Sequence, residues 1–446
     1  MERRKVLELF EAQKDMWESR AQDGIENYRK GFANITVKDK DGNPVKAKIK
    51  ASQKSHEFRF GANIFMLDEL ETDEKNNLYK KYFKETFNMA TLPFYWKDVE
   101  PTKGNTRYEK DSPKVYRRPA IDLCMEFCEE NGIEPREHAL AYEQFFPNWL
   151  SDKPVKEVKE LLEKRYKEIA DRYKDKIHTI EVTNEMDWED GKTAFYDDPD
   201  FLLWCYKMAE KYFPDNQLVV NDATHLAWID RTRYQDKYYA YIENTLLKGG
   251  RIDAIGMQYH MFFRREKEYD ETRKTYSPKE LYAHMDMYSE FNKPLQITEI
   301  TIPAYSNDKD DEKIQAELLE MLYTIWFSHP AVEQIIYWNL IDGYAFVDDP
   351  NPEKIKKSQG DMTLGENYYY GGLLRFDMSK KPAFETLQNL INKVWHTETE
   401  TVTDNGKASF KGFYGRYDLE IEVNGKVITK EINLSGKADN NFEITL

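Results

Sequence analysis

The stretch Ile180-Glu181-Val182-Thr183-Asn184-Glu185-Met186 carries the strongest signal for the fold and for a site. Apolar and β-branched residues alternate with polar ones, which is typical of a strand, and the strand runs into an Asn-Glu pair. The stretch Leu295-Gln296-Ile297-Thr298-Glu299-Ile300 has the same arrangement. In a chain with 81 acidic residues, one such glutamate is more often a solvated loop acid. Two strand-end glutamates, Glu185 and Glu299, favour a paired-carboxylate site.

Short apolar segments alternate with helical patterns on both sides of this strand, as in a parallel sheet with crossover helices. Eight repeats of this kind predict an α/β fold, a closed (β/α)8 TIM barrel, over residues 57–396. The eight predicted strands are residues 58–62, 89–92, 137–141, 179–183, 218–221, 252–258, 295–298 and 334–338.

The segments outside the barrel predict an accessory domain. Residues 1–32 have a helical pattern, whereas residues 33–56 alternate with period two around Asp41-Gly42, which predicts a β-hairpin. Residues 397–446 have the same alternating character, with a second turn at Asn424-Gly425. We therefore expect the N- and C-terminal segments to form one small β-sandwich.

In such a barrel, functional side chains lie where the strands end and the βα loops begin. Asn, Gln and His hydrogen-bond hydroxyl groups, and Trp offers a flat apolar face to a sugar ring. Two carboxylates near such amide, imidazole and indole side chains suit glycoside hydrolysis. Taken singly, His138 and Trp338 are more often core residues, and Asn221-Asp222 could equally be a plain turn. The strand-end residues are His138, Asn184, Glu185, Asn221, Asp222, Gln258, His260, Glu299 and Trp338.

The composition of the chain limits the classes of binding partner and cofactor to expect. A net charge of −16 and a pI near 5.2 argue against nucleic acid and anionic membrane surfaces. The three cysteines and eight histidines show no metal-ligand spacing, and no phosphate loop or dinucleotide fingerprint is present, so no metal or organic cofactor is expected. The charged N-terminus lacks a signal peptide's apolar region, which predicts a cytoplasmic chain, or a secreted or periplasmic one if a signal peptide has been removed. No motif specifies an oligomeric state.

Several motifs together resemble glycoside hydrolase family 10, best known as endo-β-1,4-xylanases. They are Asn184-Glu185 on the fourth predicted strand, residues 252–260, residues 297–300 around Glu299, residues 337–342 and residues 373–377. The resemblance implies a retaining β-glycosidase, with Glu299 as nucleophile, Glu185 as acid/base and the two carboxyls about 5–5.5 Å apart.

The resemblance also implies roles in substrate binding. Asn184 would hold the 2-hydroxyl of the reacting sugar, and Gln258 and His260 would orient Glu299. His138, Tyr142 and Trp338 would contact the sugar, with Trp338 as the floor under it.

Other positions depart from the family pattern. The second-strand Glu, Asn and Lys are replaced within Thr91-Leu92-Pro93-Phe94-Tyr95-Trp96, a Trp-His pair by Tyr142-Glu143, an Asp by Thr301 and a Trp by Phe346. Lost contacts to substrate hydroxyls change substrate discrimination more than reaction class. The sequence thus predicts a β-linked oligosaccharide, polysaccharide or glycoside other than ordinary xylan, with an apolar portion opposite Leu92, Phe94 and Tyr95. The alternatives are a non-catalytic carbohydrate-binding barrel and a related barrel glycosidase of different linkage specificity.

Overall fold

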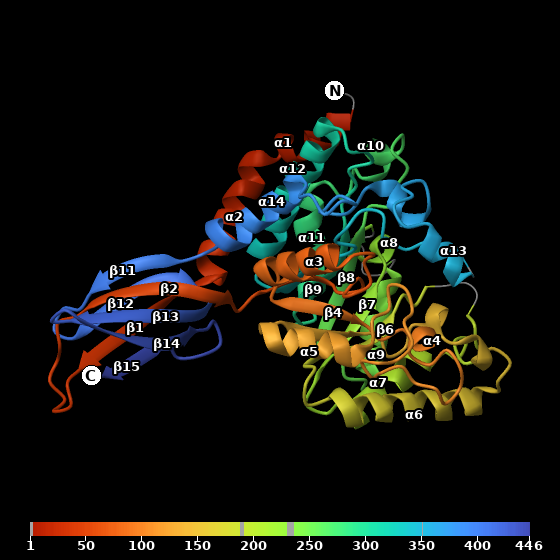
Figure 1. Ribbon diagram of the computed structural model, residues 1–446, viewed down its shortest axis with the longest axis horizontal. Helices are drawn as coiled ribbons and strands as arrows, with labels where there is room; N and C mark the ends of the chain where they lie inside the picture. The colour runs from red at the N-terminus through yellow and green to blue at the C-terminus, as the bar shows by residue number, and fades with distance from the viewer. Residues whose placement is uncertain (1–2, 188–190, 230–235, 350) are drawn as a thin grey trace.

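The computed structural model describes residues 3–187, 191–229, 236–349 and 351–446. Figure 1 shows a helix-covered barrel beside a smaller, elongated body made only of strands. The smaller body contains strands β1 and β2, near the red end of the colour bar, and β11 to β15, at its blue end, so segments from both ends of the chain build it.

The predicted number of strands, eight, is confirmed, and they form a closed parallel barrel in the order β10-β3-β4-β5-β6-β7-β8-β9. Every residue of β4, β6 and β9 is buried, because a sheet covered on the outside and filled on the inside leaves no solvated face. The strands are β3 (Arg59–Asn63), β4 (Met89–Pro93), β5 (Glu134–His138), β6 (Thr179–Asn184), β7 (Gln217–Asp222), β8 (Ala254–His260), β9 (Leu295–Thr301) and β10 (Val332–Tyr337).

The third strand differs from its prediction: it spans Glu134–His138 rather than residues 137–141. The apolar run after His138 follows β6 through single backbone bonds, from Leu140 N to Glu181 O and from Ala141 N to Val182 O. The strand itself contains ionisable residues, and an apolar pattern cannot detect a strand whose buried charges are paired inside the barrel.

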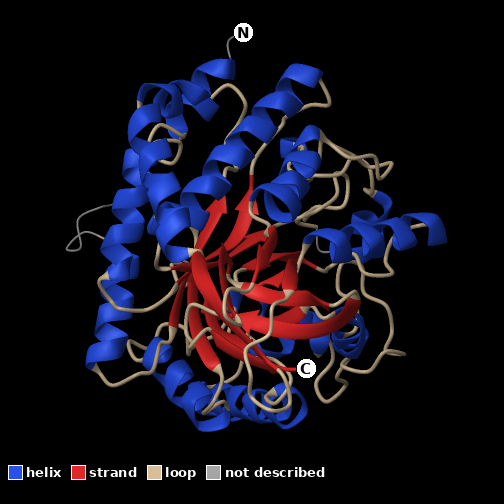
Figure 2. Ribbon diagram, turned by 90° about the vertical axis from the view of Figure 1, so that its left-hand side faces the viewer, coloured by secondary structure: helices blue, strands red, loops and turns tan. Residues whose placement is uncertain are grey.

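Helices cover the barrel from outside (Figure 2). The N-terminal helix α2 packs against α12, where Gly24 is needed because a Cβ atom there would lie 2.3 Å from Ser328 O. The longer helices are α2 (Lys14–Tyr28), α3 (Asp73–Thr86), α5 (Ile121–Asn131), α6 (Val155–Tyr173), α7 (Phe201–Tyr212), α9 (Lys237–Leu247), α11 (Pro278–Ser289), α12 (Lys309–Ser328) and α14 (Pro382–Asn389). The short ones are α1 (Glu8–Ala12), α4 (Trp96–Val99), α8 (Thr224–Ala227), α10 (Glu268–Glu271) and α13 (Pro352–Lys357).

The smaller body is a sandwich of a three-stranded sheet, β12-β1-β15, and a four-stranded sheet, β11-β2-β13-β14. Its separate hydrophobic core combines residues from both ends of the chain, among them Ile35, Ile49, Tyr417 and Leu419. The expected accessory β-sandwich is therefore present. Its strands are β1 (Lys30–Lys38), β2 (Lys48–His56), β11 (Glu398–Val402), β12 (Lys407–Phe413), β13 (Gly415–Val423), β14 (Lys426–Leu434) and β15 (Asn441–Thr445).

The predicted hairpin over residues 33–56 is wrong in its pairing. The two strands, β1 and β2, lie in opposite sheets. The pairing at the turn is confined to the segment before β2, with a bridge between Lys38 and Pro44 and a bond from Val45 N to Val37 O. Both strands bury alternate residues in the core, so they face each other across it, and C-terminal strands occupy the positions beside them. The second predicted turn does close a hairpin, β13–β14, with Asn424 and Gly425 at positive φ.

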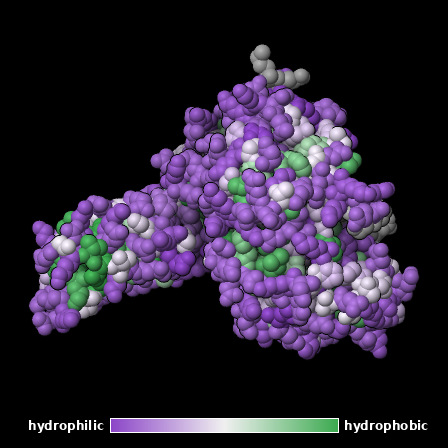
Figure 3. Space-filling view, viewed as in Figure 1, coloured by the Kyte–Doolittle hydropathy of each residue, from purple (hydrophilic) through white to green (hydrophobic). Residues whose placement is uncertain are grey.

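The face of the molecule in Figure 3 is mostly hydrophilic, in keeping with the charged composition. Among the helices of the described residues, none combines the length and apolarity that crossing a bilayer requires.

Candidate active site

The two predicted carboxylates lie together at the C-terminal end of the barrel strands. Glu299 lies within β9, and Glu185 directly follows β6. The amide nitrogen Nε2 of Gln258, on β8, lies 3.1 Å from Oε1 of Glu185 and 3.1 Å from Oε1 of Glu299. Since both oxygens bond to one nitrogen, they are at most 6.2 Å apart. Strands β6 and β9 thus present two carboxylates to one point in space.

Glu185 is held by its backbone and by one tyrosine. Its φ of 51° lies in the left-handed region, which a non-glycine residue adopts at a free-energy cost. Its backbone N donates to Asn221 O at 3.2 Å. The hydroxyl of Tyr142 donates to Oε2 of Glu185 at 2.6 Å. These contacts aim one carboxylate oxygen at Tyr142 and the other at Gln258.

Glu299 is buried among donors. The Nδ2 amide of Asn221 donates to Oε1 at 2.9 Å, and His260 Nε2 lies 3.3 Å from Oε2. Burial raises the pKa of Glu299 to about 8, although the charge of His138 opposes this rise. Donors aimed at the carboxylate favour the ionised form that a nucleophile requires.

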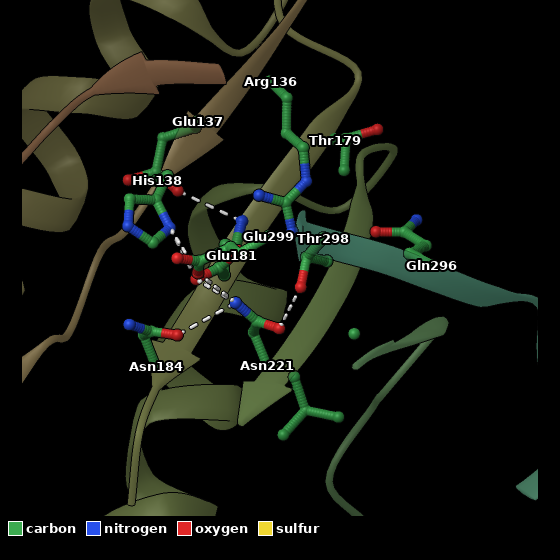
Figure 4. A network of polar contacts seen from close by, with 12 residues as sticks. Arg136, Glu137, His138, Thr179, Glu181, Asn184, Asn221, Gln296, Thr298 and Glu299 are labelled. Carbon is green, nitrogen blue, oxygen red and sulfur yellow. Dashed lines mark hydrogen bonds and ion pairs between the residues drawn. The ribbon is translucent and has the colours of Figure 1, made fainter. Parts of the chain in front are cut away.

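Beneath the two glutamates lies a buried ionic network (Figure 4). Glu181 on β6 pairs with Arg136 and His138 of β5, at 2.5 and 2.8 Å. Burial lowers the pKa of His138, but the charge and hydrogen bond of Glu181 outweigh burial, and the net shift is upward. For Glu181 burial raises the pKa, and its two cationic partners reverse that effect. The network places a positive charge near Glu299, with His138 Nδ1 at 4.0 Å from Oε1.

Aromatic rings form one wall of the site. The Trp338 ring, which follows β10, lies edge-on to Phe65 at 5.1 Å and to His138 at 5.3 Å between centroids. Tyr95 packs against Phe65 at 5.7 Å, and its hydroxyl lies 3.0 Å from His138 Nε2. Trp338 therefore belongs to the site rather than to the main barrel core.

Asn184 is one predicted contact with an unused donor. Its Oδ1 accepts from Asn221 and Gln258 at 2.9 and 3.2 Å. Its Nδ2 has no hydrogen-bond partner among the described residues, although the side chain is buried. An unpaired buried donor beside two carboxylates is suited to a substrate hydroxyl.

The structure thus brings together all eight residues predicted from the sequence. They are His138, Tyr142, Asn184, Glu185, Gln258, His260, Glu299 and Trp338. The expectation for the second strand fails in part: Leu92 and Phe94 are fully buried in the main core and cannot face a substrate, so only Tyr95 lies at the site.

Sequence reasoning missed Glu181 and Arg136 and left Asn221 undecided. In the structure, Asn221 donates to Glu299, Asn184 and Glu181, and its Oδ1 accepts from Thr298 at 2.6 Å. The missed signal was ionic: a run of three ionisable residues beginning at Arg136 lies within a barrel strand.

Two departures from the family pattern have defined contacts. Thr301 Oγ1 lies 2.9 Å from His260 Nδ1, so a hydroxyl orients this imidazole. Glu143 accepts bonds from the backbone N of Lys192 and of Thr193, which anchors the chain that follows Glu185.

A metal-like cluster is also present, since His138, Glu181 and Glu299 offer ligand atoms within 4.8 Å of one another. However, Arg136 and the Asn221 amide already contact its carboxylates, and they place positive charge and donors where a cation would lie. The donor set fits an internal ionic network better than a metal centre.

A (β/α)8 barrel with two carboxylates, hydroxyl-binding amides and an aromatic wall at its C-terminal face has the architecture of a glycoside hydrolase. A sequence comparison gives the family: the profile of "Glycosyl hydrolase family 10" matches residues 49–388, and the chain belongs to this family.

Individual relatives are distant. The anti-sigma-I factor RsgI6 of Acetivibrio thermocellus is 25% identical over 92% of this chain and 47% of its own length. Endo-1,4-beta-xylanase 1 of Arabidopsis thaliana is 23% identical over 78% of this chain and 32% of its own length. Endo-1,4-beta-xylanase B of Thermotoga neapolitana is 24% identical over 75% of this chain and 88% of its own. The chain therefore spans less than half the length of the first two.

Solved structures share the fold. Xylanase 10B of Thermotoga maritima superposes with a TM-score of 0.57 at 19% identity, over 76% of this chain and 96% of that one. Xylanase 10B of Thermotoga petrophila, solved with xylobiose, has the same TM-score and identity over 76% and 95%. Since each superposition includes nearly all of the xylanase chain and about three quarters of this one, the barrel is the shared part.

Proposed function

We propose that this protein is a retaining β-glycosidase that hydrolyses a β-linked oligosaccharide, polysaccharide or glycoside. The observation that carries the proposal is the amide of Gln258 bonded to both Glu185 and Glu299, which limits the separation of the bonded oxygens to 6.2 Å. Retaining enzymes hold their carboxyls about 5–5.5 Å apart, whereas inverting enzymes leave about 6.5–9.5 Å for a water molecule.

In the first step, Glu299 attacks the anomeric carbon as the bond to the leaving oxygen breaks, and Glu185 protonates that oxygen. The product is a glycosyl ester of Glu299. In the second step, Glu185 takes a proton from water, the water oxygen bonds to the anomeric carbon, and Glu299 leaves as a carboxylate. Two inversions return the original anomeric configuration.

The surrounding groups support this sequence. The unpaired Nδ2 of Asn184 is available for the 2-hydroxyl of the reacting sugar, a contact that strengthens in the transition state. Asn221 and His260 hold the Glu299 carboxylate in place. Tyr142 holds Glu185 through its short hydrogen bond.

For the substrate, xylan-degrading relatives favour a β-1,4-linked chain, and the replaced second-strand motif favours one other than ordinary xylan. At that position the site presents Tyr95, whose hydroxyl is engaged with His138, rather than a free amide or carboxylate. A substrate hydroxyl that would hydrogen-bond to an amide or carboxylate at this position has no such partner in this site.

A second candidate is a carbohydrate-binding barrel without turnover, because one relative, aligned over 92% of this chain, is named as an anti-sigma-I factor. Against it stands the pair of carboxylates: a binding protein has no need to hold two of them at such close range.

The test is hydrolysis of a panel of aryl β-glycosides by the wild-type protein, Glu185→Gln and Glu299→Gln. Glu163→Gln, on the outer helix α6 and paired with Lys211, is the matched control. Either site variant should lose about 100-fold or more in kcat, and the control should not. NMR of the first product should show the β-anomer. Sugar binding without hydrolysis by the wild-type protein favours the binding barrel.

A further inference from the structure

A cavity of about 680 Å³ lies in the loops that follow β4, β5, β6 and β10. Its wall includes Lys97, Arg117, Arg118 and Lys192 together with the aromatic side chains of Trp149 and Phe346. Those loops lie at the same end of the barrel as Glu185, because in a (β/α)8 barrel they all emerge at the C-terminal face.

The cavity adjoins the site through Phe145. The ring of Phe145 packs against Tyr142, the tyrosine that holds Glu185, at 4.7 Å between centroids. On its other side it meets Phe346 at 6.2 Å, and Lys97 Nζ lies 4.2 Å from its centroid. The side chains of Phe145 and Tyr142 therefore lie between the cavity wall and the acid/base glutamate.

Among the described residues, only one of the four cations forms an ion pair. Arg118 pairs with Asp98 at 2.9 Å, whereas no ion pair of Lys97, Arg117 or Lys192 is found in the described part of the chain. The two other acids of the wall lie on the loop after β10, where Asp348 is exposed and Asp349 is 3.9 Å from Lys354. The wall thus holds four cationic side chains against three carboxylates, Asp98, Asp348 and Asp349, in a protein whose net charge is −16.

Arg117 adds an independent sign of a missing partner. It is 4% exposed and has a φ of 60°, and one of its nitrogens donates to Asn339 Oδ1 at 2.6 Å. Its Nε and Nη1 are buried without any hydrogen-bond partner among the described residues. Burial lowers the pKa of Lys97, and the nearby charges of Arg118 and Lys192 lower it further, while the charges of Asp98 and Asp348 oppose this shift. Such crowded cations are stabilised by a bound anion.

We propose that this cavity is a subsite for a carboxylate-bearing sugar, a uronic acid residue of the substrate, held by Lys97 and Lys192 with Arg117 behind them. The proposal rests on the proposed function, because a glycosidase substrate brings sugars to this face. The aromatic side chains of Trp149 and Phe346 suit the apolar face of a sugar ring, and the lysines suit its carboxylate. A uronic acid would also explain why a chain without the usual second-strand polar groups keeps a polar wall nearby.

The experiment measures binding rather than turnover, so that it can be separated from the proposed function. Glu299→Gln protein is titrated calorimetrically with a β-1,4-xylo-oligosaccharide that carries one glucuronic acid branch. It is then titrated with the same oligosaccharide after reduction of the carboxyl to an alcohol. The acid should bind about tenfold or more tightly, the range expected for hydrogen bonds to a charged group.

Lys97→Gln and Lys192→Gln should each reduce this preference several-fold, while Lys97→Arg should keep most of it. Lys156→Gln is the control, since that lysine is 89% exposed on α6 and is not among the residues of the cavity wall. Equal affinity for acid and alcohol, or a preference unchanged in both cavity variants, overturns the proposal. Absence of binding by either ligand overturns it as well. A preference for the acid in a wild-type protein that hydrolyses no glycoside would instead uphold this subsite and refute the proposed function.

Discussion

Asn221→Ala removes the amide that joins the catalytic groups. In the structure, Asn221 Nδ2 donates to Glu299 Oε1 at 2.9 Å, to Asn184 Oδ1 at 2.9 Å and to Glu181 Oε1 at 3.2 Å. Because a donor to a carboxylate favours its ionised form, its loss should raise the pKa of Glu299 further above its ordinary value.

The size of this effect follows from the geometry. A hydrogen bond to a charged group contributes about 1.5–3 kcal/mol, and one pH unit corresponds to about 1.36 kcal/mol. Since the amide divides its donors among three acceptors, the effect on Glu299 should lie near the lower end, at about one pH unit. In the proposed mechanism ionised Glu299 is the reactive form, so the acidic limb of the pH profile of kcat/KM should move to a pH about one unit higher. At pH values below the limb, kcat/KM of Asn221→Ala should be roughly tenfold lower than that of the wild-type protein.

The assay is the pH dependence of kcat/KM on an activated aryl β-glycoside. Asn216→Ala is the matched control, because Asn216 is also buried and lies at the opposite end of β7. Its side-chain amide donates to the backbone carbonyls of Lys174 and Ile177, away from the carboxylates, so its loss should lower stability without moving the limb. An acidic limb that stays in place in Asn221→Ala would refute the role assigned to this amide.

Two further predictions concern Glu299 and Tyr142. The pKa of folded Glu299 is raised from 4.5 to about 8, so its stabilising contribution is complete below the unfolded pKa and is lost as the pH rises through the folded one. Relative to wild type, Glu299→Gln should then gain free energy of unfolding near pH 9, on the order of a few kcal/mol, and little near pH 4. Urea unfolding at both pH values checks this. Equal differences at the two pH values contradict it. Tyr142→Phe removes the 2.6 Å hydrogen bond to Glu185. It should lower kcat about tenfold for substrates with poor leaving groups and less for those with good ones, as a series of aryl glycosides of graded leaving-group pKa will measure. An equal loss across the series contradicts a positioning role.

Much of the barrel was predictable because its pattern is local. Each strand is short, apolar and followed by a helical segment, and these features survive in the sequence whatever the strand's neighbours are. The pairing in the sandwich was not predictable in this way. Asp41-Gly42 encodes a turn, but only the core beneath β1 and β2 decides whether the strands pair or face each other.

The residues of the site likewise fall into those that could be predicted from local sequence and those that could not. Glu185 and Glu299 were predicted because each ends an apolar run, and their separation was predicted from the family's mechanism. Asn221 was undecided because an Asn-Asp pair has the same local signature in a turn as in a site. Glu181 was missed because its role depends on Arg136 and His138 of a neighbouring strand, which only the three-dimensional structure brings close.

The altered second strand shows the limit of reading substrate specificity from residue type. Leu92 and Phe94 stand where the family pattern has sugar-binding residues, and both are apolar. The structure nevertheless places both side chains in the main core. The cavity lined by Lys97 and Lys192 is built from separate loops, and no single stretch of sequence marks it.

The central claim is that Glu299 forms a covalent bond with the sugar. The most direct measurement is mass spectrometry of the protein after incubation with activated 2-fluoro-β-glycosides of xylose, glucose and glucuronic acid. The account predicts a stable adduct of one sugar unit with at least one of them, located by peptide mapping on Glu299 and absent from Glu299→Gln. An adduct on another residue, or hydrolysis of ordinary aryl glycosides with inversion and no adduct, would contradict it.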